Sequence, residues 1–344
     1  MQVIVHGGAG ADPDEPAERQ ATLDRAGAAG AREGSPTEAV VAAVSMLEAS
    51  PKFNAGVGGA IQSDGIVRTD AGIMRSDRAA GAACGMAGVR DAVSVARLVM
   101  EETPHVLLAG ENARTFADSA GVETDCDLLT ARTERRWDAL DPPAPDESEG
   151  IDARLEWVRG HFGATGDFDE DEATDRGSAD RDMSDRAGSD RDATDRDATD
   201  HDTVGAVAVA DGAVAAATST GGRWCALAGR VGDVPQVGSG FLCTSAGGAS
   251  ATGAGEDIAR TTLSRRAIDS LEAGRAPREA AESAIAEFAE RTGSTAGLIV
   301  VNEAGETGSA FNSETMQVSV AGDAADTDGT DEDGETDATD AIDE

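Results

Sequence analysis

The sequence predicts a mixed α/β protein of the α+β kind, in which helices pack on sheets. Strand-like and helix-like patterns occur in separate blocks rather than in strict alternation, which favours helices packed on sheets over a parallel doubly wound sheet. Two ordered halves flank a long acidic segment, residues 166–202, whose arginines recur every fifth residue and match neither a helix nor a strand period. The 344 residues suffice for one large domain or two small ones, and length alone does not choose between them.

The first half opens with a short buried strand at 3–5 that leads into a turn at 6–10, His-Gly-Gly-Ala-Gly. A helix follows Ser35. Serine is a preferred N-cap residue, Pro36 suits the first helical position, and Glu38 occupies the third. The next apolar residues recur at a helical spacing, so we expect this helix to bury one face.

The later elements are predicted by the same two periodicities. In chain order they are a helix over 93–100, strands over 204–209 and 214–218, helices over 257–271 and 278–290, and strands over 296–301 and 309–320. The first helix ends before Pro104, because proline interrupts a helix. Asp211-Gly212 joins the first two strands, and this pair is typical of a hairpin turn.

Acidic residues dominate the composition, since 66 Asp and Glu outnumber 28 Lys and Arg and give a formal net charge of −38. Such a surface repels nucleic acid and anionic membranes, so we expect neither as a partner. The self-repulsion largely disappears at about 1 M salt, where the Debye length is about 3 Å. We therefore expect a salt-rich cytoplasm, that of a halophilic archaeon. An ordinary protein with acidic tails is the alternative, although the acid excess persists outside the tails.

Segments 166–202 and 322–344 are too polar to bury a core, so we expect a disordered linker and a disordered acidic tail. The cysteines are scattered without a C-x-x-C pair, at Cys84, Cys126, Cys225 and Cys243. That pattern argues against a zinc site or a disulfide scaffold, and predicts small core thiols in a reducing cytosol. The first residues show no targeting pattern, and no apolar stretch is long enough to span a membrane.

We expect the chemistry at Thr203, where the acidic segment ends and a buried strand begins. Cleavage between Asp202 and Thr203 would leave an N-terminal threonine whose hydroxyl is a nucleophile. Its own α-amine, with a reference pKa of about 7.7–8.0, is a base suited to neutral pH. On this segment alone, a threonine that merely begins a strand in an uncut chain is an equal alternative.

Several motifs elsewhere in the chain favour the nucleophile. In the first half they are 6–10, His-Gly-Gly-Ala-Gly; 53–58, Phe-Asn-Ala-Gly-Val-Gly; and 96–101, Ala-Arg-Leu-Val-Met-Glu. In the second half they are 218–222, Thr-Ser-Thr-Gly-Gly; 229–233, Gly-Arg-Val-Gly-Asp; and 251–256, Ala-Thr-Gly-Ala-Gly-Glu. In this order and spacing they resemble the family of plant-type asparaginases, isoaspartyl peptidases and glycosylasparaginases, and the resemblance covers both ordered halves.

The resemblance implies the four-layer αββα sandwich of N-terminal-nucleophile (Ntn) hydrolases, with residues 1–321 forming a single domain. It implies a precursor that cuts itself into an α chain, 1–202, and a β chain, 203–344, paired as an (αβ)2 assembly. The implied reaction is hydrolysis of L-asparagine to aspartate and ammonia, cleavage of β-aspartyl (isoaspartyl) peptides, or both. Because residues 201–203, His-Asp-Thr, are closer to the glycosylasparaginase branch, hydrolysis of N4-glycosyl-asparagine is an alternative. An uncleaved, inactive binding protein is another.

The resemblance also implies roles for single residues. Thr203 would be nucleophile and base, and Thr220 would orient it. The Thr252 hydroxyl and the Gly253 N–H would stabilise the oxyanion, and Asn54 would line the site. The residues implied to bind the substrate are Arg230, Val231, Gly232, Asp233, Thr252, Gly253, Ala254 and Gly255. No cofactor is required, but a loop of backbone carbonyls is implied to wrap a monovalent cation, usually sodium, at Leu47, Glu48, Ser50, Phe53, Ala55 and Val57.

Elementary chemistry supports these roles. An amino-acid head presents one planar anion and one cation, which suit a bidentate arginine and a carboxylate, and Arg230 and Asp233 lie three residues apart on a glycine-flanked turn. Thr252-Gly253 precedes a helix, whose N-terminus favours negative charge. The same loop, 251–255, is a candidate phosphate-binding loop, but it lacks the Gly-Lys-Ser/Thr ending of a P-loop.

Overall fold

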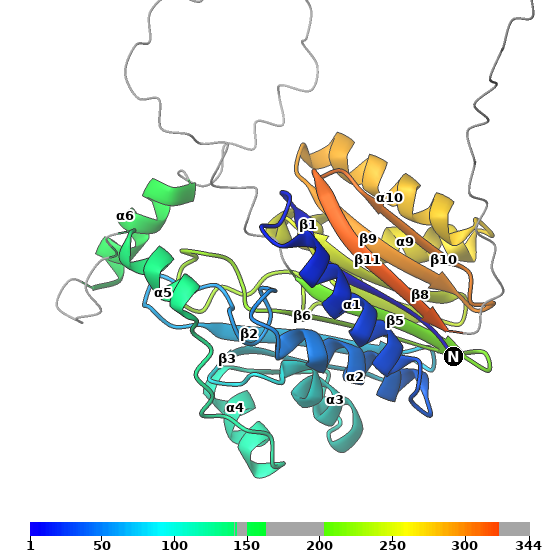
Figure 1. Cartoon of the computed structure of the whole chain (residues 1–344), viewed down its shortest axis with the longest axis horizontal. Coiled ribbons are helices and arrows are strands. Elements are labelled where there is room, and N and C mark those ends of the chain that lie inside the picture. The colour runs from blue at the N-terminus through cyan, green and yellow to red at the C-terminus, as the bar shows by residue number, and fades with distance from the viewer. Residues whose placement is uncertain (141, 143–149, 163–202, 323–344) are drawn as a thin grey trace, which may run out of the picture.

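Two β-sheets lie face to face at the centre of the molecule (Figure 1). The computed structural model describes residues 1–140, 142, 150–162 and 203–322. In spatial order, the larger sheet contains β11 (Thr315–Gly322), β1 (Gln2–Gly10), β5 (Val204–Ala210), β6 (Ala213–Thr220), β2 (Arg68–Arg75), β3 (Ala80–Ala87) and β4 (Leu107–Ala109). The smaller sheet contains β10 (Thr307–Phe311), β9 (Ala296–Asn302), β8 (Gly247–Gly253) and β7 (Phe241–Thr244). Only β3 and β4 pair in parallel among these strands.

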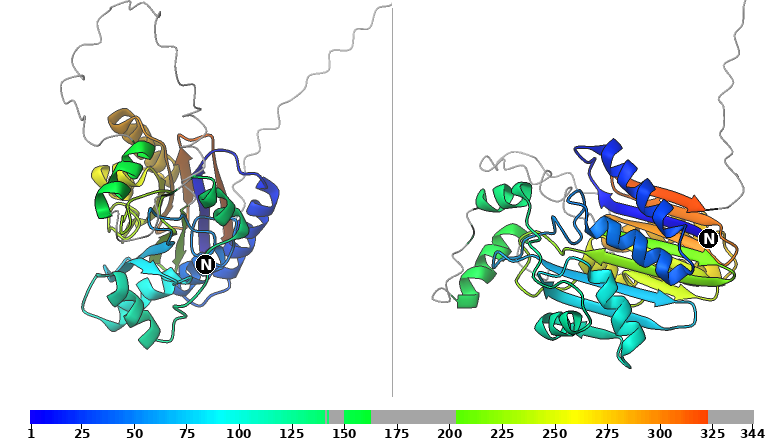
Figure 2. Two further views of the ribbon diagram at one scale, coloured as in Figure 1. Left: turned by 90° about the vertical axis from the view of Figure 1, so that its left-hand side faces the viewer. Right: turned by 60° about the horizontal axis from the view of Figure 1, so that its bottom comes forward.

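Helices cover the outer side of each sheet, as the left view in Figure 2 shows. The larger sheet carries α1 (Pro16–Gly30), α2 (Pro36–Glu48), α3 (Ala92–Glu102) and α4 (Gly110–Ser119). The smaller sheet carries α8 (Gly255–Thr261), α9 (Leu263–Glu272) and α10 (Pro277–Thr292). Two further helices, α5 (Ala131–Asp138) and α6 (Gly150–Phe162), lie beside the sheets (Figure 1). The order helix, sheet, sheet, helix confirms the predicted αββα sandwich.

The central strand β5 shows why the sequence folds into these layers. Val204, Ala206 and Ala208 face the helices of the larger sheet, whereas Val207 and Val209 face the smaller sheet. Because successive side chains of a strand point to opposite faces, an all-apolar strand can be buried on both sides. The two apolar cores are therefore separated by one sheet, and the chain entering β5 is held between them.

Two predicted features are confirmed in detail. Ser35 caps α2, since its hydroxyl accepts a hydrogen bond from the N–H of Glu38 at 3.3 Å. β5 and β6 form the expected hairpin, in which Asp211 and Gly212 have φ angles of 50° and 77°. Positive φ at both central residues is the geometry of a type I′ turn, which matches the twist of the flanking strands.

Three predicted boundaries are wrong. The helix expected over 257–271 is two helices, because Thr262 adopts the left-handed conformation, with φ 52° and ψ 57°, between α8 and α9. The strand expected over 309–320 is also two, because the chain crosses between the sheets around Asn312. That side chain accepts a hydrogen bond from the N–H of Ala296 and donates one to the carbonyl of Ser294.

The third boundary concerns the turn expected at 6–10. β1 instead continues to Gly10, with a register shift between His6 and Ala9. Gly8 has a φ of 108° there, so the glycines accommodate a β-bulge rather than a reversal of the chain. Strands β2, β3, β4, β7 and β8 and helices α1, α4, α5 and α6 have no counterpart among the predicted elements.

Other expectations have mixed outcomes. Cys84, Cys225 and Cys243 are buried as expected, whereas Cys126 is half-buried. Within the described part of the chain, no helix has the length and apolar character needed to cross a membrane. The linker expected at 166–202, with His201 and Asp202, lies outside the described residues. Of the tail expected at 322–344, Gly322 is the last residue of β11, and 323–344 lie outside the described residues.

Candidate active site

Thr203 directly precedes the central strand β5 and is 7 % exposed. Its hydroxyl donates a hydrogen bond to the hydroxyl of Thr220, 3.2 Å away at the end of the neighbouring strand β6. The Thr220 hydroxyl in turn accepts a hydrogen bond from the N–H of Gly222 at 3.2 Å. Because β5 is held between β1 and β6, the position of Thr203 is fixed by two ladders of backbone hydrogen bonds.

A cleft opens beside Thr203 and brings most of the predicted site residues together. The predicted residues that line it are Thr203, Thr220, Arg230, Gly232, Asp233, Gly253 and Gly255. Gly222 and Arg223 complete the described lining. The chain therefore brings together residues from the start of the β5 segment, β6, β8, the start of α8 and the loop after β6 around the Thr203 hydroxyl.

Arg230 is clamped by a residue that the sequence did not single out. Its Nε and Nη2 groups each donate a hydrogen bond of 2.8 Å to Glu256, in the first turn of α8. Although partial burial works in the opposite direction, this ion pair and the nearby Arg223 lower the pKa of Glu256 to about 2. The pair fixes the guanidinium plane and leaves the Nη1 group for another acceptor. An acidic residue in the first turn of a helix is so common that Glu256 carried no distinguishing signal.

Asp233 presents an unpaired carboxylate oxygen. The residue is 5 % exposed, and no donor among the described residues reaches its Oδ2 atom. Burial raises the pKa of Asp233 to about 7, although the positive charge of Arg230 opposes this shift. A buried carboxylate oxygen without a donor favours a cationic ligand, because pairing offsets its lost hydration.

The space between Arg230 and Asp233 depends on glycine. A Cβ atom on Gly255 would lie 2.7 Å from Nη2 of Arg230 and 2.9 Å from Oδ1 of Asp233. Any side chain there would fill the gap between the two charges. The gap between the two charged groups is therefore kept open by the absence of a side chain at residue 255.

The predicted oxyanion residues lie at the end of β8. Thr252 is fully buried and does not line the cleft; its hydroxyl oxygen accepts a hydrogen bond from the N–H of Ala9 at 3.3 Å. Gly253 does line it and has a φ of 136°, and a Cβ on it would lie 2.5 Å from the carbonyl oxygen of Thr295. Ala254 occupies the N-cap position of α8, without a side-chain cap. Val231 is 38 % exposed. Neither residue lines the cleft.

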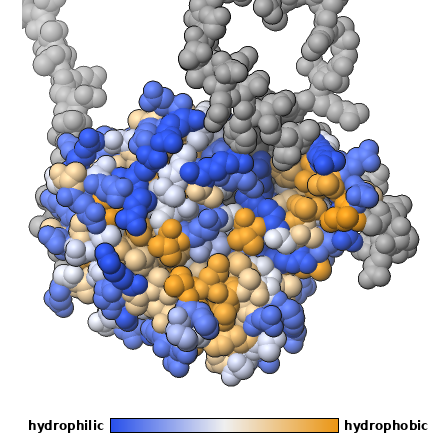
Figure 3. All heavy atoms as spheres, turned by 180° about the vertical axis from the view of Figure 1, so that it is seen from behind, coloured by the Kyte–Doolittle hydropathy of each residue, from blue (hydrophilic) through white to orange (hydrophobic). Residues whose placement is uncertain are grey.

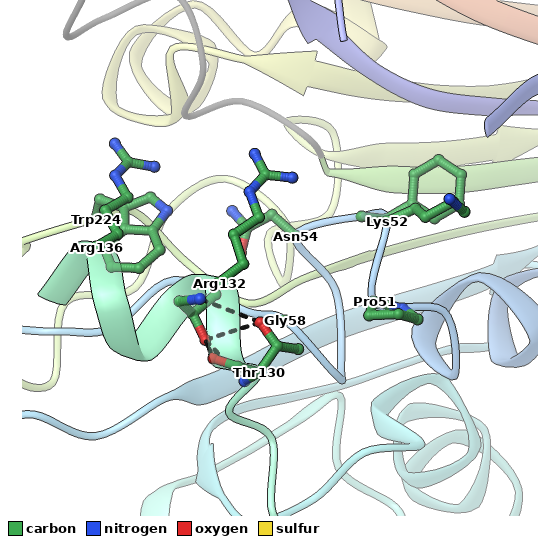
Figure 4. Close-up of a pocket in the computed structure, with 10 residues that line it drawn as sticks. Pro51, Lys52, Asn54, Gly58, Thr130, Arg132, Arg136 and Trp224 are labelled. Atoms are coloured by element: carbon green, nitrogen blue, oxygen red, sulfur yellow. Dashed lines mark hydrogen bonds between the residues drawn. The ribbon is translucent and has the colours of Figure 1, made fainter. Parts of the chain in front are cut away.

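Asn54 lies behind the cleft wall rather than in the cleft. Its amide nitrogen donates to the carbonyl of Gly222 at 2.7 Å, and its amide oxygen accepts from the N–H of Ala60 at 2.8 Å. Its own carbonyl accepts from the N–H of Gly221 at 2.8 Å. Asn54 thus supports the wall of the Thr203 cleft, and its outer side lines a neighbouring cleft (Figure 4).

A buried polar network lies between the two sheets near Thr203. His6 of β1 is fully buried, with its Nε2 atom 2.8 Å from the Ser250 hydroxyl on β8. Ser250 is 2.7 Å from the hydroxyl of Thr218 on β6. Burial lowers the pKa of His6 to about 3, and the nearby main chain of Thr203 opposes this only partly. The imidazole is therefore neutral at physiological pH and acts as a hydrogen-bonding link between the sheets.

Asp70 is a second buried carboxyl near the cleft that the sequence did not reveal. It is 2 % exposed on β2, and its Oδ1 atom accepts a hydrogen bond of 2.7 Å from the N–H of Gly85. Burial raises its pKa to about 6, against that hydrogen bond and the charge of Arg230. Its negative charge adds to the field around Arg230.

The loop after α2 can be compared with the implied cation site. The carbonyls of Leu47 and Glu48 accept hydrogen bonds from the N–H groups of Ser50 and Val57. The carbonyl of Ser50 accepts a hydrogen bond from the N–H of Phe53 at 3.5 Å. The carbonyls of Phe53, Ala55 and Val57 accept none from the described residues. Backbone carbonyls with free lone pairs in a tight loop are suitable ligands for a monovalent cation. The residues present therefore fit such a group.

Comparison with known proteins agrees with this geometry. The family described as asparaginase matches residues 1–329. A plant-type L-asparaginase of Pyrobaculum calidifontis is 38 % identical over 324 residues, covering 91 % of this chain and 94 % of that protein. An isoaspartyl peptidase/L-asparaginase of Danio rerio is 35 % identical, with 93 % and 91 % covered. A plant-type L-asparaginase of Thermococcus kodakarensis is also 35 % identical, with 91 % and 94 % covered. With a family match over nearly all of its described residues and the αββα layers around Thr203, the chain belongs to the asparaginase family.

Proposed function

We propose that this protein is an amidohydrolase that cuts itself before Thr203 and then hydrolyses L-asparagine and β-aspartyl (isoaspartyl) peptides. The observation that carries the proposal is one cleft containing the Thr203–Thr220 hydroxyl pair, Arg230 and the unpaired Oδ2 of Asp233. A nucleophile and complementary charges for an amino-acid head are thereby within reach of one small substrate. The names of the relatives from Pyrobaculum calidifontis and Danio rerio support the same reaction.

Self-cleavage uses the residues already next to the scissile bond. The Thr203 hydroxyl attacks the carbonyl carbon of Asp202, and the acyl group moves from nitrogen to oxygen. Water then hydrolyses the resulting ester, which leaves a carboxylate on Asp202 and a free α-amine on Thr203. Thr220 orients the hydroxyl for this attack.

Turnover repeats the chemistry on the substrate. Arg230 binds the α-carboxylate through its Nη1 edge, while Asp233 binds the α-ammonium group. The Thr203 hydroxyl passes its proton to the α-amine and attacks the side-chain carbonyl. The N–H of Gly253, which lines the cleft, stabilises the oxyanion, a contribution of about 10²–10³ in rate for one such donor. The α-ammonium group of Thr203 then gives its proton to the leaving nitrogen, the C–N bond breaks, and the nitrogen departs as ammonia or as the amine of an amino acid. Water then hydrolyses the acyl-enzyme ester and frees Thr203 for another turnover.

The decisive test is the intact mass of protein purified in high salt, together with ammonia release from asparagine. We expect two fragments that divide at Thr203. Thr203→Ala should stay one chain and be inactive, whereas Thr203→Ser, which keeps a hydroxyl, should still be cut. A wild-type protein that remains whole and inactive at every salt concentration would instead indicate a binding protein. Hydrolysis of N4-glycosyl-asparagine in preference to the other substrates would place it with the glycosylasparaginases.

The loop at 47–57 is proposed to hold sodium, which would rigidify the loop that carries Asn54. Gly56 has a φ of 61°, and a Cβ on it would lie 2.2 Å from the carbonyl oxygen of Glu48. We expect the thermal midpoint of the wild type to be higher in sodium chloride than in choline chloride at equal ionic strength. Gly56→Ala should lose that difference. Equal midpoints in the two salts would contradict a sodium site.

We further propose an (αβ)2 assembly in a salt-rich cytoplasm. Figure 3 shows apolar side chains gathered among hydrophilic ones on one face of the molecule. Val106 and Leu107, at the free edge of the larger sheet, are 52 % and 46 % exposed, and such exposed apolar residues often mark interfaces. Light scattering after size exclusion should give the mass of two copies; a single-copy mass would contradict the assembly.

A further inference from the structure

A second cleft adjoins the Thr203 cleft, and its charge is opposite to that of the molecule. Among the described residues that line it are Lys52, Arg132 and Arg136, and none that is acidic. The whole chain, by contrast, has 66 acidic and 28 basic residues. Figure 4 shows the side chains of Arg132 and Arg136 projecting the same way from α5. A cationic cleft in so acidic a protein favours an anionic ligand.

The three cations differ in how far neighbouring side chains already satisfy them. Lys52 is paired with Glu15 and Glu18, so it contributes little net charge. The guanidinium of Arg136 lies 4.3 Å from the ring centre of Trp224, which holds it against the cleft wall. Arg132 makes no ion pair or hydrogen bond with any side chain of the described residues. Arg132 is therefore the charge that is most available to a ligand.

Asn54 is the wall that the two clefts share. One side of it lines the cationic cleft, and its amide nitrogen bonds to the carbonyl of Gly222, which lines the Thr203 cleft. The hydroxyl of Thr220, the partner of Thr203, also donates to the carbonyl of Asn54 at 3.5 Å. Asn54 is therefore the residue that separates the cationic cleft from the Thr203–Thr220 hydroxyl pair.

The proposed substrates differ in what they place beyond that pair. Arg230 and Asp233 hold the amino-acid head, so the leaving group extends past Thr203 away from them. Asparagine leaves only ammonia there. A β-aspartyl dipeptide leaves an amino acid, and this amino acid carries a free α-carboxylate close to the scissile bond.

We propose that the cationic cleft binds the carboxylate of the leaving amino acid in β-aspartyl peptides, with Arg132 as its main partner and Arg136 as the second. This subsite rests on the proposed function and assigns its substrate class. The enzyme favours β-aspartyl dipeptides with a free C-terminal carboxylate over asparagine and over the same dipeptides with a C-terminal amide. The carboxylate is bound, not transformed, so the reaction itself is unchanged.

The test compares kcat/KM for asparagine, β-aspartyl-leucine and β-aspartyl-leucine amide, in the wild type, Arg132→Gln and Arg135→Gln. Arg135 is a matched control, because it is exposed on the same helix, bonds to the carbonyl of Ala131 and does not line the cleft. Arg132→Gln should lower the ratio of dipeptide to asparagine by about tenfold, mainly through KM, as expected for one lost charged contact. Arg135→Gln should keep the wild-type ratio.

Comparing β-aspartyl-leucine with its amide shows whether Arg132 recognises the charge of the carboxylate or affects all peptide substrates alike. Wild-type enzyme should prefer the free dipeptide to its amide, and Arg132→Gln should remove that preference. Equal loss for the dipeptide and its amide, or equal effects of Arg132→Gln and Arg135→Gln, would overturn the subsite and leave the proposed function standing. If the wild type hydrolyses none of the three substrates, the proposed function fails and the subsite fails with it.

Discussion

A buried carboxylate that lacks a donor, such as Asp233, destabilises the fold at neutral pH. Its pKa is raised by burial to about 7, against about 3.9 for a free aspartate. The folded protein therefore binds a proton more tightly than the unfolded chain between these values, and its stability falls as pH rises through this window. In the proposed function, the same charge binds the ammonium group of the substrate, and this pairing offsets the cost of burying the carboxylate.

Asp233→Asn should therefore stabilise the protein while abolishing substrate binding. In an uncut Thr203→Ala background, we expect the free energy of unfolding to rise by about 1–4 kcal/mol at pH 8. The gain should shrink at pH 5, where Asp233 is already protonated in the folded state. Thermal unfolding at both pH values measures this, and a gain that does not depend on pH would refute the explanation.

The motifs shared with the asparaginase family predicted much of the candidate site, and what they missed has a physical cause. The resemblance implied Arg230, Asp233 and Gly255, and the chemistry of an amino-acid head independently supported the roles of Arg230 and Asp233. No role was predicted for Glu256, because the bidentate contact with Arg230 is a fact of three-dimensional geometry. Asn54 was expected to line the site, and only its hydrogen bonds to Gly222 and Ala60 reveal that it supports the wall from behind.

At the level of elements, periodicity located strands and helices but not the points where they change direction. Thr262 interrupts an unbroken helical pattern because its backbone is left-handed. Asn312 divides an apolar run whose two parts belong to different sheets. β7 and β8 were missed because their glycines and small residues hide the alternation that marks a strand. Such breaks depend on contacts between distant segments, which a local pattern does not contain.

Thr262 offers a test of this interpretation. A β-branched residue in the left-handed conformation is strained by about 1–2 kcal/mol, and glycine is not. Its hydroxyl bonds only the adjacent carbonyl of Thr261, so little else is lost on substitution. Thr262→Gly should stabilise the protein by about 1 kcal/mol, after the larger entropy loss of glycine on folding is allowed for. Urea unfolding would measure the change, and a clear loss of stability would indicate that the break is not strained.

For the whole molecule, charge governs the conditions in which the sandwich holds together. With a net charge of −38, self-repulsion should destabilise the fold in dilute buffer, and salt at about 1 M should screen it. The far-ultraviolet circular dichroism signal should therefore be lost below a threshold salt concentration. Sodium chloride and potassium chloride should preserve this signal almost equally, except for the extra stability that sodium gives through the proposed site in the loop at 47–57. A fold that persists unchanged in dilute buffer would count against the halophilic interpretation.

The order of the larger sheet has a consequence for what happens after the proposed cut at Thr203. β1 belongs to the first fragment, yet it lies between β5 and β11 of the second. The fragments are interleaved, so neither can depart without unzipping backbone ladders on both sides of β1. Folding of the precursor is a unimolecular event, but the unfolded fragments would have to find each other in solution. The rate of reassembly would then depend on protein concentration, so the cut would turn a unimolecular folding reaction into a bimolecular one.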